Sequence, residues 1–222
     1  MCPSKATNAF RAQKPIYLFS ISSYPGAIHI NSLDISFFHP KINFSNYDYL
    51  IITSKQASQA LKQYDKDAYI NKKALCVSLQ SAQSFEALGG RILDIGEGYG
   101  KTLTKKIQSY PKEKKWLYLR ASVVASDFVA TCRKDGYDVD EVIVYESQCS
   151  SAIQSVSVEE YATLIFTSPS SVKCFLINNT IKSSHKVVVI GNTTAKALPK
   201  GTHYVLSNEK NIQNCIEIAK NL

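Results

Sequence analysis

The chain has 222 residues, which is enough for one large domain or two smaller ones. Its apolar share of 45% is ordinary for a globular protein, and no apolar run reaches the roughly 18 residues of a transmembrane helix. The formal net charge of +8 is compatible with an anionic partner. Because the lysines are spread out and no basic motif with interleaved aromatic residues occurs, we expect neither a nucleic-acid nor a membrane partner.

The first strand is preceded by a polar stretch, Met1–Arg11, that lacks the apolar segment of a secretory signal. We expect this stretch to be a loose extension and the protein to be cytoplasmic. Six cysteines occur without a C-x-x-C pair, and most of them fall on apolar faces of predicted elements. We therefore expect reduced cysteines and no metal site. They are Cys2, Cys76, Cys132, Cys149, Cys174 and Cys215.

Short apolar runs alternate with helical periodicity along the chain, which predicts parallel α/β sheets. Helices are expected after Thr53, where a T-x-x-Q capping box reaches Gln56, and between Ser122 and Gly136. Ser168 followed by proline predicts a further N-cap, and the chain closes with an amphipathic helix over 212–219. The expected strands are Ile16–Phe19, Tyr49–Ile52, Leu75–Val77, Arg91–Ile95, Trp116–Leu119, Val142–Tyr145, Leu164–Phe166, Val187–Ile190 and Tyr204–Leu206.

The second half of the chain repeats the first at an offset of about 114 residues. Leu50-Ile51-Ile52-Thr53-Ser54 is echoed by Leu164-Ile165-Phe166-Thr167-Ser168, and the segment 74–82 by 187–195. Each echo is a buried strand followed by hydroxyl residues that can cap a helix. Helix N-termini at the carboxyl edge of a parallel sheet favour anionic ligands, so each half predicts one such edge.

Two extended segments, Ile35–Pro40 and Glu141–Ser147, lie outside this pattern and occupy equivalent places in the two halves. Tyr17-Leu18-Phe19 precedes the first as Tyr118-Leu119-Arg120 precedes the second. We interpret the two segments as paired linker strands between two lobes.

From about Ile16 onward the sequence resembles the uroporphyrinogen-III synthase family. The resemblance rests on three stretches, of which the second is the most specific: Phe166-Thr167-Ser168-Pro169-Ser170-Ser171-Val172, Val189-Ile190-Gly191-Asn192-Thr193-Thr194-Ala195-Lys196-Ala197-Leu198 and Val144-Tyr145-Glu146-Ser147. Two features depart from the family pattern. The stretch between Phe19 and Ile35 is too short for the usual helix, and Ser78 stands where relatives often have glycine.

The resemblance implies two parallel-sheet α/β lobes with an internal pseudo-repeat, joined by a two-stranded β linker. Residues 1–38 with 146–222 would form a discontinuous first lobe and 41–140 the second, with 35–40 and 141–147 as linker strands. The implied reaction closes linear hydroxymethylbilane, an octacarboxylate, into uroporphyrinogen III with inversion of the last pyrrole and loss of water. We expect a monomer without a cofactor. A non-enzymatic two-lobed module that binds an organic polyanion would explain the repeat and the charge equally well.

The resemblance implies that Tyr145 is the catalytic residue, as a phenol that protonates the departing hydroxyl, although a structural tyrosine is the alternative. The capping hydroxyls have ligand contact as a compatible second role, and Gly191 is expected to be a turn glycine. Three cations could pair with carboxylates or be solvated. Gly96–Gly100 lacks the spacing of a phosphate loop and is interpreted as a turn. The substrate-binding candidates are Thr53, Ser54, Ser78, Ser81, Lys101, Arg120, Thr167, Ser168, Gly191, Thr193, Thr194 and Lys196.

Overall fold

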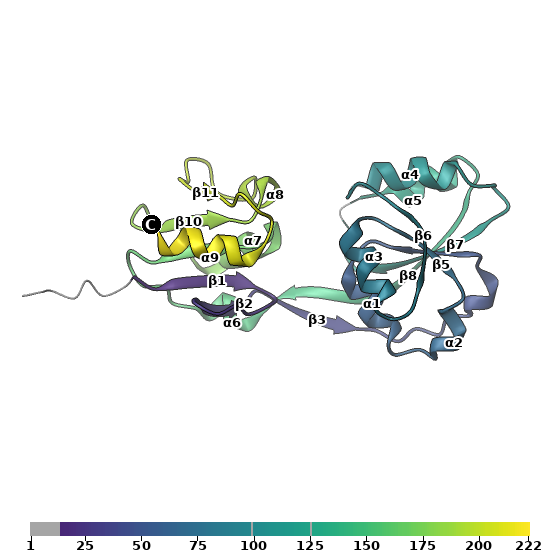
Figure 1. Ribbon diagram of the computed structural model, residues 1–222, viewed down its shortest axis with the longest axis horizontal. Coiled ribbons are helices and arrows are strands. Elements are labelled where there is room, and N and C mark those ends of the chain that lie inside the picture. The colour runs from purple at the N-terminus through teal and green to yellow at the C-terminus, as the bar shows by residue number, and fades with distance from the viewer. Residues whose placement is uncertain (1–13, 99, 125) are drawn as a thin grey trace, which may run out of the picture. The chain divides into compact units, whose positions relative to one another are not determined.

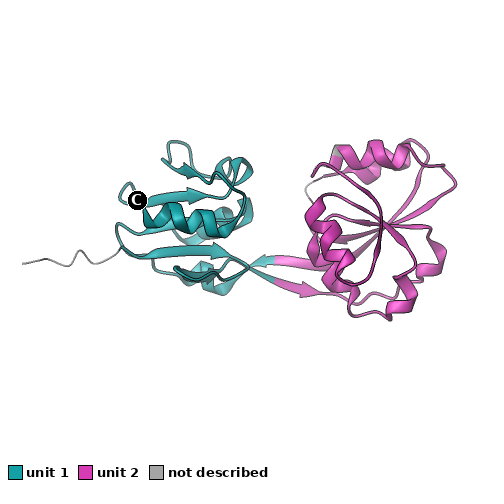
Figure 2. Ribbon diagram, in the orientation of Figure 1, with its two compact units in different colours: residues 1–34, 148–222 teal, residues 35–147 magenta. Residues whose placement is uncertain are grey.

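The computed structural model describes residues 14–98, 100–124 and 126–222, and of Lys101 only the backbone. Strands and helices alternate along the chain. The strands form two sheets, and each sheet lies within its own compact unit (Figure 1). Unit 2 is the continuous segment Ile35–Ser147, whereas unit 1 combines the chain up to Asp34 with Gln148–Leu222 (Figure 2). None of the described helices is long and apolar enough to cross a membrane.

Unit 1 is built on a sheet in which every paired strand is parallel, in the order β11-β10-β9-β1-β2. One face packs against α6, α7 and α8, and the other packs against α9. The strands are β1 (Ile16–Ser20), β2 (Ile28–Asn31), β9 (Thr163–Phe166), β10 (Lys186–Val189) and β11 (Val205–Leu206). The helices are α6 (Ser151–Ser155), α7 (Pro169–Asn178), α8 (Asn192–Ala195) and α9 (Ile212–Lys220).

Unit 2 repeats this plan with the order β3-β8-β7-β4-β5-β6, of which the last five strands are parallel. Helices α1 to α3 cover one face, and α4 with α5 covers the other. The strands are β3 (Leu33–Phe37), β4 (Tyr49–Ile52), β5 (Lys73–Cys76), β6 (Arg91–Ile95), β7 (Lys115–Ala121) and β8 (Asp138–Cys149). The helices are the 3-10 turn η1 (Phe44–Asn46), α1 (Lys55–Leu61), α2 (Lys66–Tyr69), α3 (Leu79–Glu86), α4 (Gly100–Gln108) and α5 (Phe128–Lys134).

The predicted repeat corresponds to matching strands in the two sheets, since β9, β10 and β11 occupy the places of β4, β5 and β6. The predicted correspondence between Tyr17-Leu18-Phe19 and Tyr118-Leu119-Arg120 is shifted by one residue in the structure. Tyr118 pairs with Ile51, whereas Leu18 pairs with Ile165, so Leu18 and not Tyr17 is the counterpart of Tyr118. Because alternate residues of a strand face opposite sides of the sheet, Tyr17 and Tyr118 lie on opposite faces of the repeat.

Both linker segments are strands with other bounds than predicted, since β8 extends beyond Glu141–Ser147 on both sides and β3 begins and ends before Ile35–Pro40 does. β3 lies beside β8, and the Phe38 amide donates to the Val144 carbonyl at 2.9 Å. The unit boundary crosses both strands. Val144 and Tyr145 are buried in the unit 2 core, so this part of the linker is also core.

The short connection between β1 and β2 contains no helix, as the sequence predicted. Tyr24 and Ala27 instead pack with α9 over the sheet face that includes Ile16 and Leu18. Gly26 adopts φ +93, where a Cβ would lie 3.2 Å from the Lys220 side chain. A short loop therefore covers the sheet face in place of a helix.

The expectation of reduced cysteines is wrong for one pair, because Cys149 and Cys174 form a disulfide between the end of β8 and α7. Their sequence separation gave no indication of this, since the two sulfurs meet only through the tertiary packing. Cys76, Cys132 and Cys215 are free and buried, as expected. Cys2 lies outside the described residues.

The start of one helix also differs from its prediction, whereas its end agrees. Ser122 does not begin a helix, because its amide donates to the Tyr145 carbonyl at 2.9 Å and so continues the β7–β8 pairing. The helix begins at Phe128 after Asp127 and ends before Gly136, whose φ of +85 fits the predicted stop.

Candidate active site

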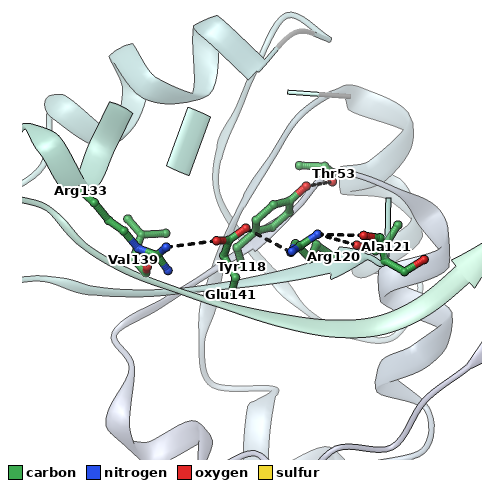
Figure 3. Close-up of polar contacts among 8 residues, drawn as sticks. Thr53, Tyr118, Arg120, Ala121, Arg133, Val139 and Glu141 are labelled. Carbon is green, nitrogen blue, oxygen red and sulfur yellow. Dashed lines mark hydrogen bonds and ion pairs between the residues drawn. The ribbon is translucent and has the colours of Figure 1, made fainter. Parts of the chain in front are cut away.

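The turn after β4 places two hydroxyls at the carboxyl end of an inner strand of unit 2. Ser54 is the N-cap of α1, and its side chain accepts a hydrogen bond from the Gln56 amide at 3.1 Å. The predicted cap at Thr53 is therefore wrong by one residue, because Ser54 has the extended backbone that precedes the first helical residue. The Thr53 hydroxyl instead lies 3.0 Å from the Tyr118 hydroxyl (Figure 3).

The turn after β5 uses both of its predicted hydroxyls to start α3. The Ser78 side chain accepts from the Ser81 amide at 3.4 Å, and the Ser81 side chain accepts from the Ser78 amide at 3.1 Å. This reciprocal capping box was visible in the sequence as two serines three residues apart. It gives Ser78 and Ser81 a structural role, and neither lines the pocket described next.

A pocket of about 260 Å³ lies at this edge of the unit 2 sheet. Its wall is largely apolar and carries four hydroxyls, of which those of Thr53, Tyr118 and Tyr145 come from three different strands or turns. No charged side chain is found among the described residues that line it. The other lining residues are Val77, Gly98, Gly100, Leu103, Ala121, Val123, Val124, Ser126 and Phe128.

Tyr145 reaches this pocket from β8, as the sequence predicted for a residue on the returning linker. Its side chain is only 7% exposed, and burial raises the pKa of the phenol above its ordinary value of 10.0, an effect that a hydrogen bond with Ser54 partly offsets. Burial likewise raises the pKa of Tyr118. Both phenols are therefore neutral at pH 7 and can donate a proton or a hydrogen bond.

Arg120, a candidate for substrate carboxylates, is already held by the protein. Its Nη1 donates to the carbonyls of Ala121 and Ser122 at 3.0 and 3.2 Å. Its Nε lies 3.1 Å from Glu141 but is not aligned for a hydrogen bond, so this contact is ionic. Glu141 also accepts from Arg133 at 3.2 Å, which leaves Arg120 at one end of a three-residue charge network (Figure 3).

The equivalent turn of unit 1 contains Thr167 and Ser168. Ser168 forms a capping box with Ser171 at the start of α7, with Pro169 at the first helical position, as predicted. Thr167 does not cap the helix, since its hydroxyl donates to the Phe19 carbonyl at 3.1 Å. The hydroxyls of this turn therefore all have protein partners.

The segment after β10 differs from its prediction. Gly191 is the N-cap residue of α8, so Thr193 and Thr194 lie within the helix and are not caps. Gly191 has an extended φ of −176 that any residue can adopt, and the interpretation as a turn glycine is wrong. A Cβ there would meet nothing within 4 Å, so the site leaves open space beside this backbone. Thr194 is buried, whereas Thr193 and Lys196 are exposed.

The structure thus brings Thr53 and Tyr145 together in one pocket with residues that the sequence analysis did not select. Tyr118 is the most informative of these, and its strand register beside Ile51 was the signal that could have identified it. Gly98 and Gly100 also line the pocket, in agreement with a turn at this edge. Lys101 begins the first turn of α4, but its side chain lies outside the described residues.

In the part of the chain that the structure describes, no group of three or more His, Cys, Asp or Glu side chains could hold a metal ion. The groups that this edge of the sheet does offer are hydroxyls and helix N-termini. The described pocket has an apolar part that can bind an uncharged ring and hydroxyls in its wall that can form hydrogen bonds to that ring.

Comparison with known proteins places the chain in a family. The family model for uroporphyrinogen-III synthase HemD matches residues 27–217. The solved uroporphyrinogen-III synthetase of Helicobacter pylori shares the fold at 21% identity with a TM-score of 0.76, over 94% of this chain and 99% of that one. A mutant uroporphyrinogen III synthase of the extremely thermophilic bacterium Thermus thermophilus aligns at 12% identity with a TM-score of 0.57, over 86% of each chain. No curated protein matches the sequence.

Proposed function

The chain belongs to the uroporphyrinogen-III synthase family, and we propose that it cyclises hydroxymethylbilane to uroporphyrinogen III with inversion of the terminal pyrrole. The observation that supports a reaction, and not only binding, is the neutral phenol of Tyr145 in an apolar pocket. A module that only binds a polyanion would be expected to line its pocket with cations, and the described lining contains none. The site is instead suited to a ring that loses a hydroxyl.

Tyr145 would assist the first step as a general acid. The bond between the terminal carbon and the hydroxyl oxygen breaks, the oxygen takes the phenol proton, and water leaves a cationic azafulvene. Ring closure later releases a proton from a pyrrole carbon, which restores the phenol. The phenol carries its proton at neutral pH, since its pKa lies above 10.0, and its place in the pocket lining allows it to deliver that proton to the departing oxygen.

The pocket size supports recognition of one ring at a time. Its volume of about 260 Å³ is below the range of about 300–1,000 Å³ for pockets that enclose drug-sized ligands. We infer that the reacting pyrrole enters the unit 2 pocket while the rest of the tetrapyrrole lies outside it. In unit 2, the helix N-termini after β4 and β5, at Ser54 and Ser78, would then bind carboxylates through backbone amides. Unit 1 offers the same kind of group after β9 and β10, at Ser168 and Gly191. Thr193 and Lys196, together with Lys101 and Arg120, are proposed carboxylate contacts.

Product analysis tests this function directly. Freshly generated hydroxymethylbilane is incubated with the protein, the products are oxidised to porphyrins, and the two ring isomers are separated. We expect the inverted isomer to dominate, whereas the uninverted isomer alone, at the level of a protein-free sample, would favour the binding module.

We further propose that the protein acts in the cytoplasm as a monomer, on this small molecule and not on nucleic acid. The biosynthetic family supports the location, and the absence of a clustered basic motif from the sequence supports the choice of partner. Light scattering after size-exclusion chromatography should give the mass of one chain, 24.7 kDa. A mass near twice that value would contradict the monomer.

Finally, we propose that the reaction needs no metal ion or organic cofactor. Exhaustive dialysis against a chelator should leave the rate of isomer formation unchanged. A loss of rate that one added metal ion restores would overturn this proposal.

A further inference from the structure

The two halves of the repeat use an equivalent threonine hydroxyl in different ways. Thr167 in unit 1 donates to a backbone carbonyl, that of Phe19, at 3.1 Å. Thr53 in unit 2 lies 3.0 Å from the hydroxyl of Tyr118, a side chain on the adjacent strand β7 (Figure 3). The threonine at this position of the repeat therefore bonds to the backbone in unit 1, whereas in unit 2 it forms a pair with another side-chain hydroxyl.

The phenol of Tyr118 is not required by the fold of the repeat. The strand register places Leu18 at the equivalent position of unit 1, opposite Ile165, and Leu18 is fully buried there. An aliphatic side chain therefore satisfies the packing at this point of the sheet. Tyr118 is also buried, at 4% exposure, and it packs its ring against Phe128 with centroids 5.0 Å apart. A buried hydroxyl is costly unless it is hydrogen-bonded, and Thr53 supplies that bond, so the phenol and the Thr53 hydroxyl form a polar pair that packing alone does not require.

The Thr53–Tyr118 pair retains hydrogen-bonding capacity that faces the pocket. Ser54 caps α1, so Thr53 is not used for that purpose. Among the described residues, neither hydroxyl has a further hydrogen-bond partner in the protein. One hydroxyl proton is used within the pair, which leaves the second proton and free lone pairs. Both residues line the same pocket as Tyr145, among apolar side chains.

We propose that Tyr118 determines product specificity: with Thr53 it accepts the pyrrole N–H of the hydroxymethyl-bearing ring in the unit 2 pocket and so fixes the face of its exocyclic carbon that the last pyrrole attacks. This proposal rests on the proposed synthase function. A pyrrole has one N–H donor and otherwise apolar edges, and the hydroxyl pair is an acceptor set at one side of a largely apolar wall. Tyr145 remains the residue that assists departure of the hydroxyl, so the two phenols have separate roles.

Tyr118→Phe removes one hydroxyl and retains the ring that packs on Phe128. We expect the proportion of uninverted product to rise by about threefold to tenfold, the range that corresponds to loss of one hydrogen bond. Because unbound substrate also cyclises to this isomer, the ratio is measured at several enzyme concentrations and extrapolated to saturating enzyme. If the variant enzyme itself forms more of the uninverted isomer, the altered ratio persists at saturating enzyme. If the variant is only slower, the ratio returns to the wild-type value there.

Two further variants separate specificity from folding. Thr53→Val should raise the uninverted product as Tyr118→Phe does, and the double variant should raise it no further, because the two hydroxyls act as one unit. Thr53→Ser keeps the hydroxyl and should restore the wild-type ratio. Tyr137→Phe is the matched control, since the Tyr137 hydroxyl donates to the Gln108 carbonyl at 2.9 Å within the same unit but outside the pocket lining.

A wild-type isomer ratio for folded Tyr118→Phe at saturating enzyme would overturn the proposal. If Tyr118→Phe does not fold, a wild-type ratio for folded Thr53→Val would overturn it in the same way. If the wild-type protein forms none of the inverted isomer, the proposed function itself fails. The wild-type sample alone shows this, without any of the variants.

Discussion

The sulfur of Cys76 illustrates how strongly single side chains are enclosed in unit 2. The thiol is fully buried at the end of β5, and burial, with a smaller contribution from the Glu86 carboxylate, raises its pKa from 9.0 to about 12. A group whose pKa is raised in the folded state stabilises the fold below its unfolded pKa, and this stability is lost as the pH rises toward the folded value. The relevant window therefore runs from pH 9.0 to about 12.

We expect the free energy of unfolding of the wild-type protein to fall across that window, and to fall less steeply in Cys76→Ala. Urea unfolding curves at pH values from about 8 to about 11 measure both slopes, and the buried tyrosines contribute equally to the two proteins. Parallel slopes for the two proteins would show that Cys76 does not contribute to the alkaline loss.

At the scale of single residues, the sequence predicted only part of the roles. Tyr145 was selected through a family motif, and the structure places it in a pocket, but the choice between Thr53 and Ser54 as cap depended on backbone angles that two adjacent hydroxyl residues do not reveal. Tyr118 was not selected because its relation to Thr53 spans 65 residues and arises from strand pairing. Local patterns identify caps and cores, whereas contacts across a sheet require its register.

At the scale of elements, the sequence predicted most strands well but missed the edge strand β2. β4 and β6 have the predicted bounds, and for the inner strand β4 a continuous apolar run defines them. β2 was missed because Ile28–Asn31 is a short, partly exposed edge strand without a continuous apolar run. The disulfide between Cys149 and Cys174 was missed for a similar reason, because it joins elements that meet only in the folded unit.

This disulfide should stabilise unit 1 measurably. Closing a loop with a sequence separation of 25 residues is expected to contribute about 3–4 kcal/mol, mainly by restricting the unfolded chain. A thiol reductant should therefore lower the urea midpoint of the wild-type protein. In Cys174→Ala the same reductant should have no effect, which separates the disulfide from other consequences of reduction. An unchanged wild-type midpoint would mean that the bond is absent or does not contribute to stability.

At the scale of the whole molecule, the two units of the repeat differ in continuity, because unit 2 is one segment of the chain and unit 1 is formed by its two ends. Unit 2 has its own core on each face of its sheet and is continuous in sequence. We expect residues 35–147 to unfold cooperatively as an isolated fragment, as judged by circular dichroism in urea. Residues 1–110 should not, because this fragment lacks β7, the strand that pairs with β4 inside the sheet. Cooperative unfolding of the shorter fragment would contradict this division of the chain.

The central claim is that the unit 2 pocket performs the chemistry through the neutral phenol of Tyr145. The measurement is the turnover of hydroxymethylbilane per folded molecule for Tyr145→Phe beside Tyr137→Phe, with thermal unfolding of each. We expect Tyr145→Phe to lose about tenfold to a hundredfold in rate, the lower range of general-acid effects, with a loss of stability no larger than that of Tyr137→Phe. Tyr137→Phe should keep its rate and lose about 1 kcal/mol of stability with its hydrogen bond. A wild-type rate for folded Tyr145→Phe would contradict the claim and leave catalysis to backbone amides and substrate folding.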